Sequence, residues 1–262
     1  HHIALLSEPT VYSLYCDMAM ASNRDQSDGF NLLAVFDFDH TLVDGNTDTW
    51  ITKLYEDAKH LQNNKGTCWT DKMAEVFRTL HEKNFTKLDF EQCLQSLPFT
   101  DGMKELLTFI AAQDIPCIII SDSNSYFIKY LMEFNNVMHC VKEIHTNLAN
   151  WNDSQLLTIQ YYHTHNCSQC PANMCKGDIL KSYIKNTDSA GKTILYVGDG
   201  RNDYCATLEM KTSDYVFARE GYSLLKILKQ NAQRQRTQPI VVPWRTGFDI
   251  LGKVTNIVEK QL

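Results

Sequence analysis

Short apolar runs that end abruptly in polar clusters form the clearest pattern in the chain. The runs LLAVF, CIII and TILYV lead into DFDHT, SDSNS and GDGRND, and a weaker run, DYVFA, leads into REG. Continuous aliphatic and β-branched runs of this length are typical of parallel strands that are buried on both faces. The pattern therefore predicts strands at about 32–36, 117–120, 193–197 and 214–218.

Helical repeats lie between these predicted strands. Apolar side chains recur at helical spacing within 103–110, 126–131 and 179–184, which predicts amphipathic helices. Strand alternating with helix predicts an α/β fold with an open, doubly wound and mainly parallel sheet. In such sheets, ligands bind beyond the carboxyl ends of the strands. We therefore expect the polar clusters to converge on one site, although they are far apart in sequence.

The segment 46–98 has a different pattern. It lacks a convincing buried-strand run and contains one clear amphipathic repeat, formed by Met73, Val76, Phe77 and Leu80. We interpret it as a helical cap inserted between the first and second strands of a core formed by 29–45 and 99–262. Residues 1–28 are interpreted as an N-terminal tail that is flexible or non-native. The stretch 147–165 alternates and contains turn residues, which predicts a small hairpin.

Composition and charge narrow the function classes. The 262 residues are 44% hydrophobic and 21% charged, with a net charge of −6, as expected of a globular protein. The sequence has no basic stripe to suggest nucleic-acid binding, and its apolar runs are too short to span a bilayer. Nine cysteines without a clear secretion signal predict free thiols and a cytoplasmic location. The oligomeric state is not predicted.

Two pairs of carboxylates are expected at the edge where the strands end. Asp37 and Asp39 follow the first strand, and Asp199 and Asp203 follow the run TILYV. Carboxylates grouped so tightly repel one another, so a cation is expected among them, and oxygen ligands favour Mg²⁺. A carboxylate held by Mg²⁺ beside a phosphoryl group can attack it, which would form an aspartyl-phosphate.

Two further residues suit the handling of phosphate. Ser121, at the tip of the second strand, offers a hydroxyl, and Lys176 offers a positive charge for phosphoryl oxygens. The alternative is that Asp, Ser and Gly after strands are only turn formers, which is the commoner explanation for any single cluster. The ordered combination of all four motifs favours a functional site.

The motifs DFDHTLVDGNTDTW, IIISDSNS, CPANMCKGDIL and YVGDGRNDYC resemble the four motifs of the haloacid dehalogenase superfamily of phosphatases. NTDTW, SDSNS and HTHNCSQCPANMCK are similar, more narrowly, to the family of phosphoethanolamine/phosphocholine phosphatases and their pyridoxal phosphate phosphatase relatives. The resemblance extends from about Leu32 to the VVPW region. It implies a Rossmann-like three-layer core with a cap, and Mg²⁺-dependent hydrolysis of a small phosphorylated metabolite.

The resemblance also implies residue roles. Asp37 would be the nucleophile, and Asp39 would protonate the leaving alcohol and then activate water. Mg²⁺ would be held by the Asp37 carboxylate, the Asp39 backbone carbonyl and Asp199, with Asp203 in support. Ser121 and Lys176 would hold the phosphoryl oxygens.

Two more carboxylates are candidates for substrate selection. Asp48 lies in NTDTW and Asp122 lies beside Ser121, and both could bind a cationic head group if they face the pocket. Aromatic side chains could add a cation–π face or a stacking wall for a pyridoxal ring; the candidates are Trp50, Trp69 and Tyr126. The alternative is that Asp48 caps a helix and that the tryptophans belong to the core of the cap.

The run HTHNCSQCPANMCK concentrates metal-ligand residue types just before Lys176. Four residues could bind a structural Zn²⁺ that holds the loop carrying this lysine, with His163 as a spare ligand; they are His165, Cys167, Cys170 and Cys175. A redox pair is less favoured, because that motif normally opens a helix after a strand. The simplest alternative is a set of small buried thiols beside a turn at Pro171.

Two other function classes remain open at this point. A phospho-receiver domain also phosphorylates an aspartate at a strand end, although it would need neither the second Asp of DFD nor a cap. A zinc-bearing interaction protein on an inactive enzyme fold is the other alternative, and it predicts the loss of a catalytic carboxylate.

Overall fold

The first predicted strand lies at the centre of the sheet. The computed structural model describes residues 30–58, 68–232 and 238–261, so the predicted tail at 1–28 lies outside the described residues. The sheet has the strand order β4-β3-β2-β1-β5-β6-β7, and all pairs are parallel except β3 with β4. The strands are β1 Leu32–Phe36, β2 Cys117–Asn124, β3 Glu143–Trp151, β4 Leu157–Gln160, β5 Thr193–Gly198, β6 Tyr215–Arg219 and β7 Ile240–Trp244.

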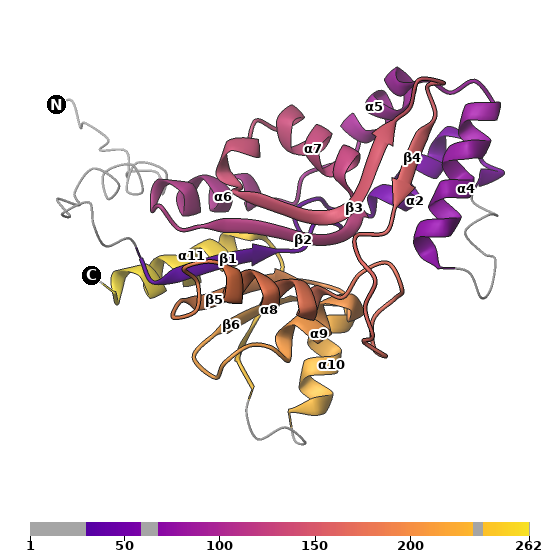
Figure 1. The fold of residues 1–262 in the computed structure, drawn as a ribbon. Helices are drawn as coiled ribbons and strands as arrows, with labels where there is room; N and C mark the ends of the chain where they lie inside the picture. The colour runs from indigo at the N-terminus through magenta and orange to yellow at the C-terminus, as the bar shows by residue number, and fades with distance from the viewer. Residues whose placement is uncertain (1–29, 59–67, 233–237, 262) are drawn as a thin grey trace, which may run out of the picture.

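Helices cover both faces of this sheet (Figure 1). The described α-helices are α2 Thr47–Ile51, α4 Trp69–Glu82, α5 Lys87–Gln95, α6 Met103–Ala112, α7 Ser125–Phe134, α8 Lys176–Asn186, α9 Tyr204–Thr207, α10 Ser223–Asn231 and α11 Gly247–Glu259. Short 3₁₀ turns are η1 Thr52–Leu54, η2 Met138–Cys140 and η3 Arg201–Asp203. None of the described helices is both long and apolar enough to cross a membrane.

The side chains of β1 show why helices cover both faces of the sheet. Successive side chains of a strand point to opposite faces. Ala34 and Phe36 belong to the core cluster that contains residues of α6, α7 and α11, whereas Leu33 and Val35 pack in a second cluster with α8. Every residue of β1 is buried, as predicted for the continuous apolar run. The prediction of a doubly wound, mainly parallel α/β sheet is confirmed.

Two strands differ in extent from their sequence patterns. β2 continues through the polar stretch to Asn124, with a register irregularity between Ile120 and Asn124, so Ser121 and Asp122 lie within the strand. The predicted hairpin in 147–165 is confirmed in part of that stretch, because β3 and β4 pair as antiparallel neighbours. β7 did not stand out from the sequence, because its run is short and contains Pro243.

The described part of 46–98 is helical and contains no strand. Phe77 of α4 and Phe90 of α5 form edge-on or tilted ring contacts with Phe127 of α7. Tyr161, just after β4, donates a hydrogen bond to Asp71 of α4, and α4 packs along β4. These contacts join the insert to the sheet. The division into a core and an inserted cap with the predicted boundaries stays a prediction.

Two glycines allow α11 to approach the start of α6. Gly102 has a left-handed φ of 75° and precedes α6, and the Gly247 amide donates to the Asp101 carbonyl at 2.7 Å. A Cβ on Gly247 would collide with the backbone of Gly102. A side chain at position 247 would therefore have no room where α11 crosses the start of α6.

We predict that Gly247→Ala lowers the free energy of unfolding by about 1–3 kcal/mol, because overpacking displaces the backbone. Gly252→Ala is the matched control in α11, since a Cβ there meets nothing within 4 Å. It is expected to raise stability by up to about 1 kcal/mol through helix propensity. Urea unfolding of both variants tests this, and equal effects of the two substitutions would contradict the close approach.

Candidate functional site

The predicted carboxylates meet at the edge of the sheet where β1 and β5 end. β1 lies between β2 and β5, and the Asp37 amide continues the ladder by donating to the Val197 carbonyl at 2.9 Å. Carboxylate oxygens of Asp37, Asp199 and Asp203 lie within 4.8 Å of one another. The expectation that these sequence-distant residues converge is thus met for this group.

Lys176 lies among these carboxylates as a buried cation. Its Nζ is 2.8 Å from Asp37 Oδ2 and 2.8 Å from Asp203 Oδ1, and its side chain is 1% exposed. Burial acts to lower the pKa of Lys176, but the carboxylates of Asp203 and Asp37 outweigh it and raise the pKa above its ordinary value. Lys176 is therefore charged, and it is held against Asp37.

Asp203 is a supporting residue rather than an open ligand. Its Oδ1 accepts hydrogen bonds from Lys176 and from the buried Tyr196 hydroxyl, and its Oδ2 accepts from the amides of Asp199 and Gly200. Four donors occupy both of its oxygens. Asp203 thus fixes the Lys176 ammonium and the loop that carries Asp199.

Asp37 and Asp199 have the environment of cation ligands. Burial raises the pKa of Asp37 to about 7, with a further contribution from Asp203 that Lys176 partly opposes. Burial also raises the pKa of Asp199 to about 9, and the nearby carboxylates of Asp37 and Asp203 add to this shift. Among the described residues, no hydrogen-bond donor contacts the Asp199 carboxylate. Three clustered carboxylates with one lysine leave negative charge uncompensated, which fits a divalent cation with oxygen ligands.

Asp39 is held by the first turn of α2. Its Oδ1 accepts from the Thr47 amide at 3.0 Å, and its Oδ2 accepts from the Asn46 side chain at 3.0 Å and the Thr47 hydroxyl at 3.2 Å. The Thr47 hydroxyl also contacts Ser123 of β2 at 2.7 Å. Burial raises the pKa of Asp39 well above its usual value, and Asp48 adds to the shift.

A cavity of about 390 Å³ lies over these residues. Its lining includes the predicted catalytic and substrate-selecting carboxylates and one further predicted metal ligand: Asp37, Asp39, Asp48, Asp122 and, as the metal ligand, Asp199. Trp69 of α4 and Gln169 and Pro171 of the cysteine-rich loop complete part of the wall. The volume suits a small metabolite.

Ser121 is fully buried in β2, and it is not among the residues lining this cavity. Its hydroxyl accepts from the Ser123 amide at 3.3 Å. Its predicted contact with a phosphoryl oxygen stays a prediction.

The aromatic candidates separate into different environments. Trp69 lines the cavity and donates from Nε1 to Asp48 Oδ2 at 2.7 Å. Trp50 instead donates to Ser96 and the Cys93 carbonyl within the insert. The Tyr126 hydroxyl donates to Glu91, and neither Trp50 nor Tyr126 is part of the cavity lining. Burial raises the pKa of Asp48 to about 7, and the Trp69 hydrogen bond partly opposes this.

Arg219, at the end of β6, was missed by the sequence reasoning. Its guanidinium donates to the His40 carbonyl at 2.6 Å and to Asp44 at 2.7 Å, and it lies over the rings of Tyr222 and Trp244. His40 has a left-handed φ of 54°, so Arg219 fixes the turn that follows the two catalytic candidates. The REG cluster after the fourth apolar run was the available signal.

Arg201 and Asn202 also line the cavity without having been predicted. They lie in the GDGRND motif between Asp199 and Asp203. Their position in a motif already assigned to the site was the signal that could have found them.

The cysteine–histidine run differs from the predicted ligand set. Cys167, Cys170 and Cys175 gather with Cys205 of α9, and His165 is not part of this group. His165 Nε2 donates to the Pro171 carbonyl at 2.8 Å, while its Nδ1 accepts from the Cys167 amide at 3.1 Å. Both ring nitrogens are therefore hydrogen-bonded within the loop, and the prediction that His165 binds zinc stays a prediction. Cys205, which was not among the predicted residues, lies in the group.

Comparisons with known proteins identify the family of the chain. A sequence model of the family described as Putative Phosphatase matches residues 32–258. The chain is 37% identical over 239 residues to the pyridoxal phosphate phosphatase of Homo sapiens, covering 87% of this chain and 99% of that protein. It is 31% identical over 238 residues to the phosphoethanolamine/phosphocholine phosphatase of Homo sapiens, covering 87% of this chain and 89% of that protein.

The fold comparison adds an independent finding. A substrate-bound phosphoserine phosphatase superposes with a TM-score of 0.59 at 18% sequence identity, covering 87% of this chain and 99% of that chain. At this identity the likeness concerns the fold, and it confirms the Rossmann-like architecture. The chain therefore belongs to the Putative Phosphatase family, and it is a phosphomonoesterase with the fold of haloacid dehalogenase phosphatases.

Proposed function

We propose that the protein hydrolyses a small phosphomonoester in a Mg²⁺-dependent reaction with Asp37 as the nucleophile. The observation that carries the proposal is the position of Asp37, which follows the central strand, lines the cavity and contacts the buried Lys176. Attack by an Asp37 carboxylate oxygen on phosphorus would form an aspartyl-phosphate and release the alcohol. Water would then cleave the acyl-phosphate and restore Asp37.

The Asp37 and Asp199 carboxylates and the Asp39 backbone carbonyl would hold Mg²⁺, with Asp203 as their support. The bound cation would neutralise charge on the phosphoryl oxygens and on the clustered carboxylates. The proposal is supported by the clustering and burial of the carboxylates, and by the oxygen ligands that this ion prefers.

Lys176 would supply charge to the transferred phosphoryl group. An ammonium has three N–H donors, and contacts with Asp37 and Asp203 use two of them. The third has no partner within the described part of the chain and would donate to a phosphoryl oxygen, and Lys176 itself is buried and is not among the residues lining the cavity. The hydroxyl of Ser121 would be a second donor on the β2 side.

Asp39 would act first as an acid and then as a base. Its raised pKa favours the protonated form, which can donate to the leaving oxygen. After this transfer the same carboxylate would take a proton from water for the second step. The donors from Asn46 and Thr47 orient its oxygens toward one edge of the cavity.

The substrate is proposed to carry a positively charged nitrogen as well as its phosphate. Asp48 and Asp122 line the same cavity as Asp37 and would attract a positively charged group. Pyridoxal phosphate is the first candidate, because Asp48 could pair with a pyridinium nitrogen, and Trp69, which donates to Asp48, lines the same cavity. A relative at 37% identity bears that activity in its name. Phosphoethanolamine and phosphocholine are the alternatives. The primary ammonium of the first or the quaternary ammonium of the second would use the same carboxylates.

The proposed roles of Asp37 as nucleophile and Asp39 as acid can be distinguished by how the activity of each variant depends on the leaving group of the substrate. Asp37→Asn is expected to lower turnover of every phosphomonoester at least roughly 1,000-fold. Asp39→Asn should still release p-nitrophenol rapidly in the first turnover, since that leaving group needs no proton, and should then stall at the phosphoenzyme. Stopped-flow kinetics with p-nitrophenyl phosphate and Mg²⁺ would show this burst.

Wild-type protein treated with EDTA is the control for metal dependence in this experiment. Turnover that persists in Asp37→Asn or in excess chelator would disprove the proposed function. A missing burst in Asp39→Asn, together with proportional losses for alkyl and aryl substrates, would instead disprove its acid–base role.

The carboxylate cluster also predicts a pH dependence of stability. Burial and neighbouring carboxylates raise the folded-state pKa of Asp37 to about 7 and that of Asp199 to about 9, above the ordinary aspartate value of about 3.9. Between these limits the folded protein therefore binds more protons than the unfolded chain. Metal-free stability should therefore fall as pH rises from about 5 to about 9. Added Mg²⁺ replaces the protons, so its stabilising effect should be larger at pH 8.5 than at pH 6.

Asp199→Asn tests the origin of this dependence. It should raise metal-free stability at pH 8.5 by on the order of 1–3 kcal/mol, because the wild-type carboxyl must take up a proton or bury its charge on folding whereas the amide need do neither, and it should remove most of the stabilisation by Mg²⁺. Asp153→Asn, at the exposed β3–β4 turn, is the matched control and should change neither quantity. Thermal denaturation with EDTA and with Mg²⁺ measures both; an unchanged Mg²⁺ effect in Asp199→Asn would contradict the assignment.

Substrate choice can be tested with a panel of phosphomonoesters. Asp48→Asn is expected to lower kcat/KM about 10–100-fold for the preferred substrate with a positively charged nitrogen, because a desolvated charge pair is lost. It should have little effect on phenyl phosphate, which has no basic group. The panel compares pyridoxal phosphate, phosphoethanolamine and phosphocholine, with the exposed Glu82→Gln of α4 as the control. Equal losses on all substrates would contradict a role in selection.

A further inference from the structure

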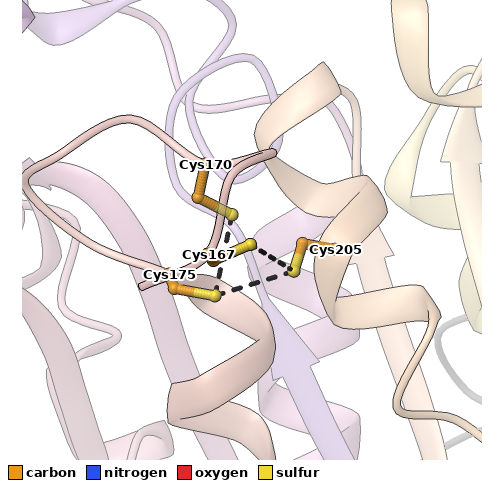
Figure 2. A group of neighbouring side chains, drawn as sticks. All are labelled: Cys167, Cys170, Cys175 and Cys205. Carbon is orange, nitrogen blue, oxygen red and sulfur yellow. Dashed lines mark hydrogen bonds between the residues drawn. The ribbon is translucent and has the colours of Figure 1, made fainter. Parts of the chain in front are cut away.

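Four cysteine sulfurs form a compact group beside the phosphatase site (Figure 2). Cys167 and Cys170 come from the loop between β4 and α8, Cys175 caps the N-terminus of α8, and Cys205 lies in α9. The sulfur–sulfur distances are 3.7 Å for Cys167–Cys205, 3.6 Å for Cys170–Cys175 and 3.6 Å for Cys175–Cys205. All four sulfurs lie within 4.8 Å of one another.

These distances match the edges of a metal-centred tetrahedron. Four thiolates at about 2.3 Å from Zn²⁺ lie about 3.8 Å apart when they occupy tetrahedral corners. The eight described cysteines are all free thiols, so no disulfide accounts for the group. Soft sulfur ligands in tetrahedral number select Zn²⁺ over the Mg²⁺ expected at the carboxylates.

The surrounding backbone is arranged to bring the sulfurs together. A Cβ on Gly177 would lie 2.8 Å from the Cys205 sulfur and 2.9 Å from its carbonyl oxygen, so the absence of a side chain lets α8 and α9 approach. The Asp178 amide points at the Cys175 sulfur at 3.4 Å. A helix N-terminus and an N–H donor both stabilise a thiolate. Simple burial of small thiols does not require this glycine contact.

We propose that Cys167, Cys170, Cys175 and Cys205 bind one structural Zn²⁺ as a four-thiolate site. Each thiol releases its proton to solvent as its sulfur coordinates, and no oxidation or reduction is involved. Four protein ligands close the coordination shell, as in structural rather than catalytic zinc sites.

The proposed zinc site would tie together two segments that carry the phosphate site. Cys175 directly precedes Lys176, and Cys205 follows Asp203 by one intervening residue. Lys176 and Asp203 are themselves joined at 2.8 Å. One zinc ion would therefore hold the first turn of α8 and the first turn of α9 in the relative position that this ion pair requires.

The zinc content of the purified protein tests the proposal. The measurement does not require turnover, so its result is independent of the proposed phosphatase reaction. Protein expressed with added zinc and purified without strong chelators should contain about one zinc per chain by mass spectrometry of metals. Replacement by Co²⁺ should give intense thiolate-to-cobalt charge-transfer bands and the visible bands of a tetrahedral ion. Zinc below about one tenth of an equivalent and no such bands, or iron in place of zinc, would overturn the proposal.

Variants identify the ligands. Cys205→Ser and Cys170→Ser should weaken zinc retention against a competing chromogenic chelator by at least about tenfold, and should lower the melting temperature. Two variants should retain zinc: Cys93→Ser, whose sulfur contacts the Trp50 carbonyl in the insert, and His165→Ala. If a ligand variant does not fold, the cobalt spectrum of wild-type protein still decides the sulfur count. Loss of zinc in His165→Ala with retention in Cys205→Ser would overturn the four-cysteine assignment.

Discussion

The burial of Lys176 between Asp37 and Asp203 is the constraint on which the site depends. A buried ammonium is tolerated only when anions surround it, and buried carboxylates are tolerated only when cations or donors surround them. Here the lysine contacts two carboxylates at 2.8 Å, and Asp203 is further satisfied by Tyr196 and two backbone amides. The remaining negative charge lies on Asp37 and Asp199, where we propose that a divalent cation binds. One arrangement of charges thus serves both stability and chemistry.

Much of this site could be predicted because parallel strands place their carboxyl ends at one edge. The apolar runs at 32–36 and 193–197 identified β1 and β5, and the polar residues after them identified Asp37, Asp39, Asp199 and Asp203. The helical content of 46–98 was likewise visible in its amphipathic repeat. These features depend on local periodicity and on a general property of sheet topology, and both can be read from a sequence.

The features that were missed depend on contacts between distant segments. Cys205 lies beside the three predicted cysteines because α9 packs against α8, whereas short spacing in the sequence favoured His165. Arg219 reaches the His40 carbonyl from the end of β6, and a single arginine after a weak apolar run carries no mark of that partner. Ser121 lies within β2 rather than at its tip because of an irregularity in pairing with β3. Side-chain direction at such an irregularity is not encoded in a periodic pattern.

The strand order has a consequence for how the chain acquires its site during synthesis. The Asp37 carboxylate directly follows the first described strand, but its cation lies on α8, and the neighbouring strand β5 follows later still. A ribosome-bound chain that ends before Lys176 therefore presents the β1 carboxylates without their counter-charge, and β1 without one of its two neighbours. Domains complete their folding only after such distant partners have emerged. The nascent protein must therefore remain without a finished phosphate site until the segment through α9 has left the ribosome.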